Sequence, residues 1–441
     1  MDPSSSFWLR TAGSKGNAQR LLLVAMTAAA SLQFALFHLM YEKHDDLSVR
    51  QLMSPRGEST VLRHSSMTTQ ERRLPNLTDH VSENYTSPLA AAVLPIQTYD
   101  RQIARSEEYA RAFEPWPSHV PLPCFPPANR RKWHTPSTPP NTTDGFIFMK
   151  LMKTGGSTAA GIHLRIMRQI ASDRNKKFDF CRGKFNHAWG YEVMSEKKVD
   201  PLKSFAWTVV REPTRRAISQ FFHFEVSRGG VNPTDFNFQK YLHSEKRIIR
   251  HHYLQVLNSE KIYPPTKITK DVAPGVIRNI FNAYDFVGVT ERMEESAVCL
   301  MMLLNLKMST ILYLNAKTNG AYDDGGHGQC SWIQPSVVSR GMKLYFREPH
   351  WEELVRWDEI FYDAANLSLD LTIQKLGQNK FEQNLAKFRE ARKVANEKCR
   401  GREVFPCTST GAKNVHPDCL WKDSGCGVTC LDEVAAEMRL A

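Results

Sequence analysis

The stretch "FIFMKLMKTGGSTAAGIHLRI", residues 146–166, decides how the fold of this chain is interpreted. It opens with an apolar and aromatic run of strand length, residues 146–149. Apolar or aromatic residues then recur at helical spacing, at Ala159, Ile162, His163, Ile166 and Ile170. The pattern therefore predicts a strand, a short polar turn and a helix.

The polar turn contains residues that together can bind an anion. Glycine leaves backbone amides unobstructed, hydroxyls donate hydrogen bonds, and the start of a helix carries the positive end of its dipole. The candidate phosphate- or sulfate-binding residues are Lys150, Lys153, Thr154, Gly155, Gly156, Ser157 and Thr158. The lysine precedes the glycines, unlike the order in the loop of nucleotide triphosphatases. The alternative is an ordinary glycine turn in which Ser157 caps the helix.

A second strand, turn and helix follow at residues 204–224. Residues 204–210 form a buried-type strand, Arg211 ends it, and Pro213 sits where a first helical turn tolerates proline. Ser219 lies about two turns into the helix, so Arg211 and Ser219 are candidates to hold a further phosphate. Arg215 and Arg216 could add to the positive electrostatic potential at this phosphate site.

A third strand is predicted at residues 286–289, followed by a turn and a helix with an apolar face. Strands that alternate with helices indicate an α/β domain whose parallel sheet is covered on both faces. Ligands of such sheets bind beyond the carboxyl ends of the strands, which is where both polar turns lie.

The chain of 441 residues carries a net charge of +12, with 41% hydrophobic residues. These values fit one sizeable domain with appendages, and the charge is compatible with a polyanionic ligand without proving one. Residues 21–40 have no formal charge and are long enough to cross a bilayer. Basic residues precede them and acidic residues follow, which predicts a type II signal anchor after a cytoplasmic tail, residues 1–20. A cleaved signal peptide is the alternative.

Beyond the anchor, residues 41–143 are rich in Ser, Thr, Pro and charge, which predicts a stem, part of which could pack on the next domain. The catalytic-type domain is expected at residues 144–376, and a helix with a cysteine-rich tail at 377–441. Four glycosylation sequons follow the anchor, at Asn76, Asn84, Asn141 and Asn366.

Nine cysteines also follow the anchor, and five of them lie in the tail. In an oxidising compartment this crowding predicts disulfides, with an odd thiol left over. The alternative is a zinc site built from Cys407, His416, Cys419, Cys426 and Cys430, although these residues contain no Cys-x-x-Cys pair.

Two motifs in this order resemble a known family. "KLMKTGGST" looks like the 5'-phosphosulfate loop, and "REPTRRAIS" looks like the 3'-phosphate motif, of the membrane-bound carbohydrate sulfotransferases that use 3'-phosphoadenosine 5'-phosphosulfate (PAPS). The nearest likeness is to the galactose 3-O- and the heparan and uronyl 2-O-sulfotransferases. It covers residues 146–304 and includes "VGVTERMEES". Met152 departs from the pattern, since relatives often have His or Pro there.

The resemblance implies a role for each matching residue. Lys153 would contact the phosphosulfate, residues 154–158 would hold the 5'-phosphate, and Arg211 and Ser219 would hold the 3'-phosphate. Relatives place a histidine base between the two motifs, and "KFNHAWGYEV" supplies His187. An unperturbed histidine pKa near 6.5 suits proton transfer from an acceptor hydroxyl.

Two alternatives to this base stay open. His187 could be a packed histidine beside Trp189, and Glu192 is the reserve base, since burial can raise the pKa of a carboxyl group. His251, His252 and His327 are weaker candidates to line the acceptor site.

The resemblance implies a P-loop-like, three-layer α/β sulfotransferase anchored in the Golgi membrane. Its co-substrate would be PAPS, its partners a glycan acceptor and the membrane, and it would need neither a metal nor a nucleic acid. Two other functions remain: a nucleotide-dependent kinase, which would need carboxylates for magnesium, and a tethered glycan-binding protein with an inactive enzyme fold.

Overall fold

The computed structural model describes residues 106–124, 145–175, 184–186, 188–193, 204–244, 249–262, 267–317, 320–323, 330–420 and 423–440. All of them belong to one compact unit, Pro88–Ala441. The expected cytoplasmic tail and anchor, His187, His327 and the sequons at Asn76, Asn84 and Asn141 lie outside the described residues. Within the ranges just given, no helix combines the length and apolarity that a bilayer crossing requires.

The core of the unit is a four-stranded parallel sheet with the order β2-β1-β3-β4. Its strands are β1 (Gly145–Lys150), β2 (Lys184–Asn186), β3 (Ser204–Val210) and β4 (Phe286–Val289). Every residue of β1, β3 and β4 is buried, which explains why these strands are continuous apolar runs rather than alternating ones. The predicted α/β fold with a parallel sheet is confirmed.

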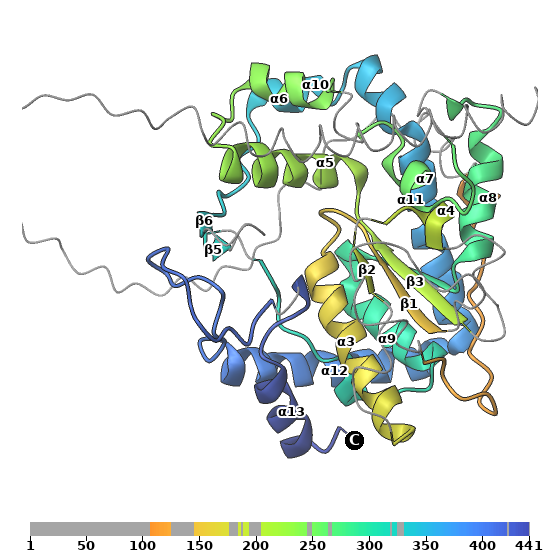
Figure 1. The fold of residues 1–441 in the computed structure, drawn as a ribbon. Helices are drawn as coiled ribbons and strands as arrows, with labels where there is room; N and C mark the ends of the chain where they lie inside the picture. The colour runs from red at the N-terminus through yellow and green to blue at the C-terminus, as the bar shows by residue number, and fades with distance from the viewer. Residues whose placement is uncertain are drawn as a thin grey trace, which may run out of the picture. The chain divides into compact units, whose positions relative to one another are not determined.

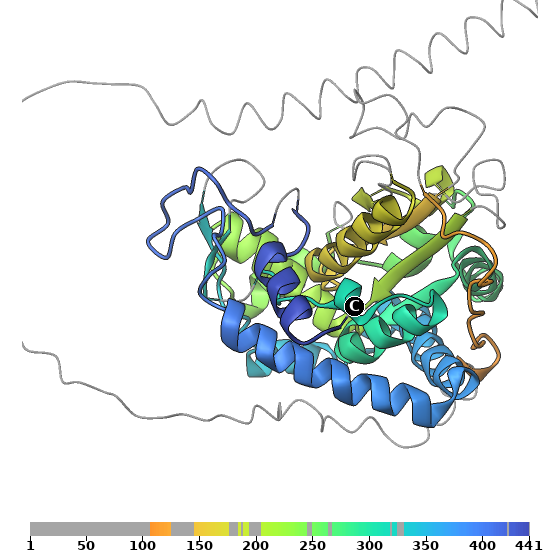
Figure 2. The ribbon, with the colours of Figure 1, turned by 90° about the horizontal axis from the view of Figure 1, so that it is seen from below.

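Helices cover both faces of the sheet (Figures 1 and 2). Helix α3 (Gly156–Asp173) lies on one face, and α11 (Pro349–Leu376) lies on the other. Helix α9 (Met293–Leu303) follows β4 through the 3₁₀ turn η6 (Thr290–Arg292). Its predicted apolar face is buried as expected, at Ala297, Leu300, Met301 and Leu304.

The helix after β3 differs from the prediction in its second half. Helix α5 (Pro213–Phe221) starts with Pro213 in its first turn, as expected, and Glu212 caps it through hydrogen bonds from the amides of Thr214 and Arg215. The chain then continues as the π-helix η4 (Phe222–Arg228), which periodicity did not reveal.

The remaining described elements complete the unit. They are α4 (Gly190–Val193), α6 (Asp235–Leu242), α7 (His252–Leu257), α8 (Ala273–Ala283), η7 (Met308–Ile311), α10 (Arg340–Tyr345), α12 (Gln378–Cys399), α13 (Val428–Glu437) and the antiparallel pair β5 (Tyr322–Asp323) and β6 (Ser331–Trp332). The β5 and β6 pair was not predicted.

Residues 106–124, within the expected stem, pack on this core. Phe113 is buried against the rings of Phe281 and Phe286. Its amide donates to Thr372 Oγ1 at 2.9 Å, and the amide of Trp116 donates to the carbonyl of Leu303 at 2.8 Å. This segment is therefore part of the globular unit.

Disulfides hold the cysteine-rich tail, as predicted. The pairs are Cys330–Cys407, Cys399–Cys430 and Cys419–Cys426, and Cys124 is also disulfide-bonded. The zinc alternative is wrong, because its four cysteines are all oxidised in these pairs. Among the described residues, Cys299 is a free cysteine, and it is buried in α9.

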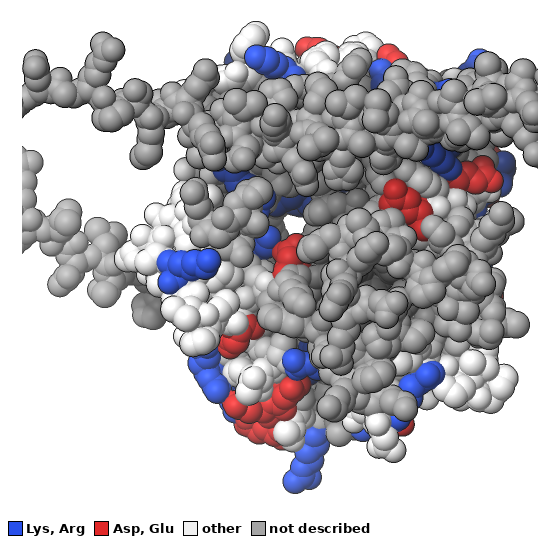
Figure 3. Space-filling view, viewed as in Figure 1, with Lys and Arg blue, Asp and Glu red and all other residues white. Residues whose placement is uncertain are grey.

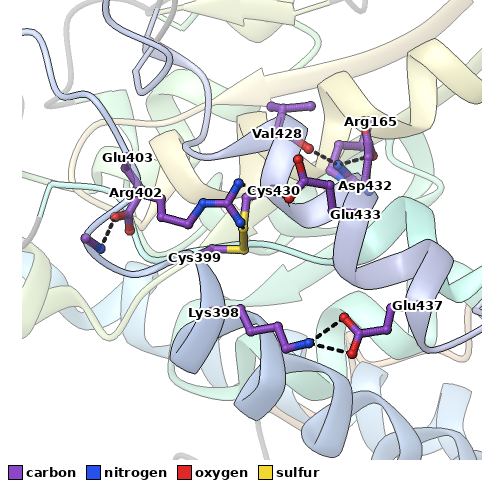
Figure 4. Close-up of a disulfide and its surroundings, with 11 residues drawn as sticks. Arg165, Lys398, Cys399, Arg402, Glu403, Val428, Cys430, Asp432, Glu433 and Glu437 are labelled. Atoms are coloured by element: carbon purple, nitrogen blue, oxygen red, sulfur yellow. Dashed lines mark hydrogen bonds and ion pairs between the residues drawn. A yellow bond between two sulfur atoms is a disulfide. The ribbon is translucent and has the colours of Figure 1, made fainter.

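Around the Cys399–Cys430 bridge, α13 is tied to two other helices (Figure 4). Buried Arg165 of α3 donates to the Val428 carbonyl at 3.3 Å and pairs with Asp432 at 2.8 Å. At the surface, Lys398 of α12 pairs with Glu437. The tail is thus attached to α3, the helix that begins at the predicted anion-binding turn.

We predict that Gly161→Ala destabilises the protein. Gly161 lies inside α3, where alanine normally gains up to about 1 kcal/mol of stability over glycine. A Cβ atom here would lie 2.6 Å from Gly425 Cα, so α3 and the tail loop must separate, at a cost of about 1–3 kcal/mol. Gly275→Ala in α8 is the matched control, because its Cβ would meet open space. Thermal unfolding should show a lower midpoint for the first variant and an unchanged or higher one for the second; equal midpoints would contradict the close approach.

Candidate anion-binding site

The loop between β1 and α3 has the backbone geometry that glycine makes possible. Gly155 is the N-cap residue of α3, with φ of 70° in the left-handed region. At Gly156 an added Cβ would lie 2.9 Å from the Lys150 side chain and 3.0 Å from the Leu151 carbonyl. The capping alternative for Ser157 is wrong, because no side chain caps α3. The first-turn amides, which have no intrahelical acceptors, are therefore left to other partners.

Lys153 lies in this loop with φ of 63°, a left-handed conformation that is strained for a residue with a Cβ atom. Its carbonyl accepts a hydrogen bond from Arg211 Nη1 at 3.3 Å. The two motifs that the sequence separates by more than fifty residues are therefore in direct contact.

Because the strands are parallel, β4 ends at the same edge of the sheet as β1 and β3. Thr290, directly after β4, donates from Oγ1 to the Thr154 carbonyl at 2.6 Å. Glu291 lies 3.8 Å from Arg211 Nε. The backbone of Arg211 exchanges two hydrogen bonds with the hydroxyl of buried Tyr253, which fixes the point where its side chain leaves β3.

Positive charge is concentrated at this edge of the sheet. Burial, together with the nearby cations Lys317, Arg211 and Arg228, lowers the pKa of Lys153 to about 7, against the effect of Asp323. Lys153 is thus only about half protonated near neutral pH, and an anion beside it would restore the full charge. Figure 3 shows Lys and Arg side chains on the left and upper sides of a hollow between α5 and the start of α3, with acidic atoms below it.

The residues of the second motif differ in burial. Ser219 is half-buried on α5, and Arg215 is half-buried as well. Arg216 is fully buried, donates to Gln220 Oε1 at 2.6 Å, and lies 5.7 Å above the ring of Tyr253. Arg216 therefore belongs to the core beneath α5 rather than to the sheet edge.

Two of the predicted anion-binding side chains already have a carboxylate partner, which the sequence did not suggest. Lys150 forms an ion pair with Asp423, and Ser157 donates to Asp423 Oδ1 at 2.7 Å. Asp423 lies in the tail loop closed by Cys419–Cys426, and the amide of Gly425 donates to the Ser157 carbonyl at 2.9 Å. Lys150 and Ser157 thus attach the tail to the loop between β1 and α3, which we call the anion loop.

The carboxylate of Asp423 also begins a chain of alternating charges. Lys317 lies 3.0 Å from Asp423 and 3.3 Å from Asp323, and Arg228 lies 3.4 Å from Asp323. This charge chain joins the tail, the β5 strand and the π-helix η4 around Lys153.

Sequence reasoning missed a buried histidine whose electrostatic neighbours include Lys153. His223, in η4, is 6% exposed, and the charges of Lys153, Arg228 and Lys317 reach it. The pattern "FFHF" gave no signal, because an α-helical reading treats this histidine as one more residue on an amphipathic face.

The other candidates lie as follows. His187 is outside the described residues. Glu192 accepts a hydrogen bond from the Trp189 amide at 3.4 Å, within the turn that begins α4. His251 and His252 are buried beside α11, where the amide of His251 donates to the Leu354 carbonyl at 3.0 Å.

Comparison with known proteins adds no assignment. Neither a protein-family model nor a curated protein matches the chain. The function therefore has to be argued from the geometry of this site and from the two motifs.

We predict that Asp423→Asn lowers the free energy of unfolding by about 2–3 kcal/mol, because the Lys150 side chain is only 4% exposed and loses its carboxylate partner. Chemical denaturation of the full chain measures the loss. The control is Glu437→Gln in the surface pair with Lys398, which should cost at most about 1 kcal/mol. Equal losses in the two variants would show that Asp423 does not hold the tail on the loop.

Proposed function

We propose that this protein transfers the sulfuryl group of PAPS to a hydroxyl of a glycan. The observation that carries the proposal is the hydrogen bond from Arg211 to the Lys153 carbonyl, which joins the two motifs at the carboxyl edge of one parallel sheet. PAPS carries phosphates at the 5' and 3' positions of its ribose, so it would need two anion sites close together, such as those at the ends of neighbouring strands. The fold fits the P-loop-like, three-layer type that this family resemblance implies.

The residues present fit such a donor. The left-handed turn at Gly155 would leave the first amides of α3 available to a 5'-phosphate. The hydroxyl of Thr154 donates to the Leu151 carbonyl at 3.4 Å, and that of Thr158 accepts from the Ala316 amide at 3.1 Å, so both would support the loop. Lys153 would contact the phosphosulfate, and its pKa near 7 lets it gain charge as the anion enters. Arg211 and Ser219 would hold the 3'-phosphate, the arginine through paired donors.

Lys150 and Ser157 would act less directly in this proposal. Both are bound to Asp423, so they would shape the loop and balance its charge while the backbone amides bind the phosphate. This division differs from the roles that the sequence motif alone implies.

The reaction would be an in-line displacement at sulfur. A bond forms between the acceptor oxygen and sulfur, while the bond from sulfur to the 5'-phosphate oxygen breaks and leaves its electron pair on the phosphate. Lys153 would stabilise that charge. His187 would take the proton of the acceptor hydroxyl, with Glu192 as the alternative base.

Two variants should affect donor binding and turnover independently of each other. Arg211→Ala should weaken PAPS binding about 10- to 100-fold, because a charge-assisted, paired contact to phosphate is lost. His187→Ala should lower turnover by about 100-fold or more and leave donor affinity nearly unchanged. Calorimetry with PAPS and a transfer assay against a glycan panel measure the two effects.

The matched control for Arg211 is Arg356→Ala, which removes an exposed arginine of α11 that pairs with Glu352. It should bind PAPS as the wild type does. Equal PAPS affinity in the Arg211 and Arg356 variants would contradict the donor assignment. Binding of ATP with magnesium in place of PAPS would favour the kinase, and glycan binding without transfer would favour the inactive fold.

We also propose a type II Golgi protein whose catalytic domain is lumenal, on the strength of the uncharged residues 21–40 and the disulfide-held tail. Membranes washed with alkaline carbonate should retain the full chain, because a spanning helix resists that extraction. Recovery of the chain in the wash would rule out the anchor.

A further inference from the structure

His223 is buried in the π-helix η4 with an unused polar atom. Its side chain is 6% exposed, and among the described residues its Nδ1 atom has no hydrogen-bond partner. A buried polar group without a partner costs stability, so its retention needs an explanation. Short π-helical segments often occur at functional sites, and this one directly follows the helix that carries Ser219.

The surroundings of His223 are cationic from several elements. Lys153 faces it from the loop after β1, Arg228 from η4 itself, and Lys317 from the segment after η7, while Asp323 of β5 is the acidic neighbour. Burial and these cations lower the pKa of His223 to about 2, so the imidazole is neutral at physiological pH.

The position of His223 relates it to both donor motifs. Ser219 precedes it by four residues, close to one helical turn, and Lys153 acts on it electrostatically from the anion loop. The imidazole is therefore near the point where the two phosphate sites of the proposed function meet. It belongs to neither motif, and the family resemblance assigns it no role.

We propose that His223 is a further donor-binding residue, whose neutral imidazole takes up a proton when the donor's anionic groups enter and then donates a hydrogen bond from Nδ1. This inference rests on the proposed function. The protonated imidazole would be a cation that exists only in the complex. The free protein therefore need not hold a fourth positive charge beside Lys153, Arg228 and Lys317.

Donor binding and protonation of His223 should favour each other. In the free protein His223 is neutral at every pH above about 4, because its pKa is about 2. A bound polyanion offsets the three cations and raises that pKa, so His223 adds up to one proton to the complex, in addition to the fraction of a proton that Lys153 gains. Donor affinity therefore rises as the pH falls through the pKa of the complexed imidazole, by up to about tenfold per pH unit.

Calorimetry of the full chain with 3'-phosphoadenosine 5'-phosphate, which carries both phosphates, tests the proposal. Titrations at pH 6.5 in two buffers of different ionisation enthalpy give the number of protons taken up. The wild type should take up about one proton more than His223→Asn, whose amide can occupy the Nδ1 position but does not titrate. His223→Phe, which has no polar atom, should also lose about tenfold or more in affinity.

The control is His243→Gln, an exposed histidine beside the Tyr345 hydroxyl, which should match the wild type in uptake and affinity. Proton uptake that is equal in the wild type and in the folded His223→Asn variant overturns the inference while leaving the donor site intact. Absence of binding by the wild type overturns the proposed function instead. Thermal midpoints of both His223 variants establish that they are folded, and either folded variant suffices for the comparison of proton uptake.

Discussion

The parallel register of β1, β3 and β4 is the constraint on which the rest of this structure depends. Val210 pairs with Val289, and Met149 pairs with Thr208, so three strands end along one edge of the sheet. The chain after each strand must then share a small volume with the chain after its neighbours. The contacts among Lys153, Arg211 and the Thr290 turn follow from that geometry.

The same edge is completed by residues from the far end of the chain. Asp423 supplies a carboxylate to Lys150 and Lys317, and the disulfide between Cys419 and Cys426 keeps the loop that carries it short. The close approach of Gly161 and Gly425 leaves no room for a side chain between α3 and this loop. The tail is therefore a structural part of the candidate anion site.

Positive charge held without an anionic ligand has an energetic cost, and the structure limits it in two ways. Asp323 and Asp423 alternate with Arg228 and Lys317, so part of the charge is neutralised inside the protein. The second way concerns Lys153 and His223. Both have lowered pKa values and so carry less charge than an exposed lysine or histidine. If the proposed donor binds here, such a site would accept a polyanion without holding the full repulsion beforehand.

The sequence by itself determined the regular parts of the fold. Three strands were placed within their observed bounds, and the starts of α5 and α3 were located to within a few residues, because continuous apolar runs, glycine turns and an early proline are local signals. The crowding of cysteines likewise predicted a disulfide-held tail. These features depend on residues close together in the chain.

Only the tertiary structure decided which side chains surround the anion loop. Asp423 lies more than two hundred residues from the loop it neutralises, and neither periodicity nor spacing reports a contact over that separation. His223 was missed because this π-helix has only 7 residues, too few to show a hydrophobic period of its own. Its charge state is set by burial and by cations from three separate segments. Long-range electrostatics and packing are properties of the folded chain, which is why the motifs could indicate an anion site and the structure alone could show its charge balance.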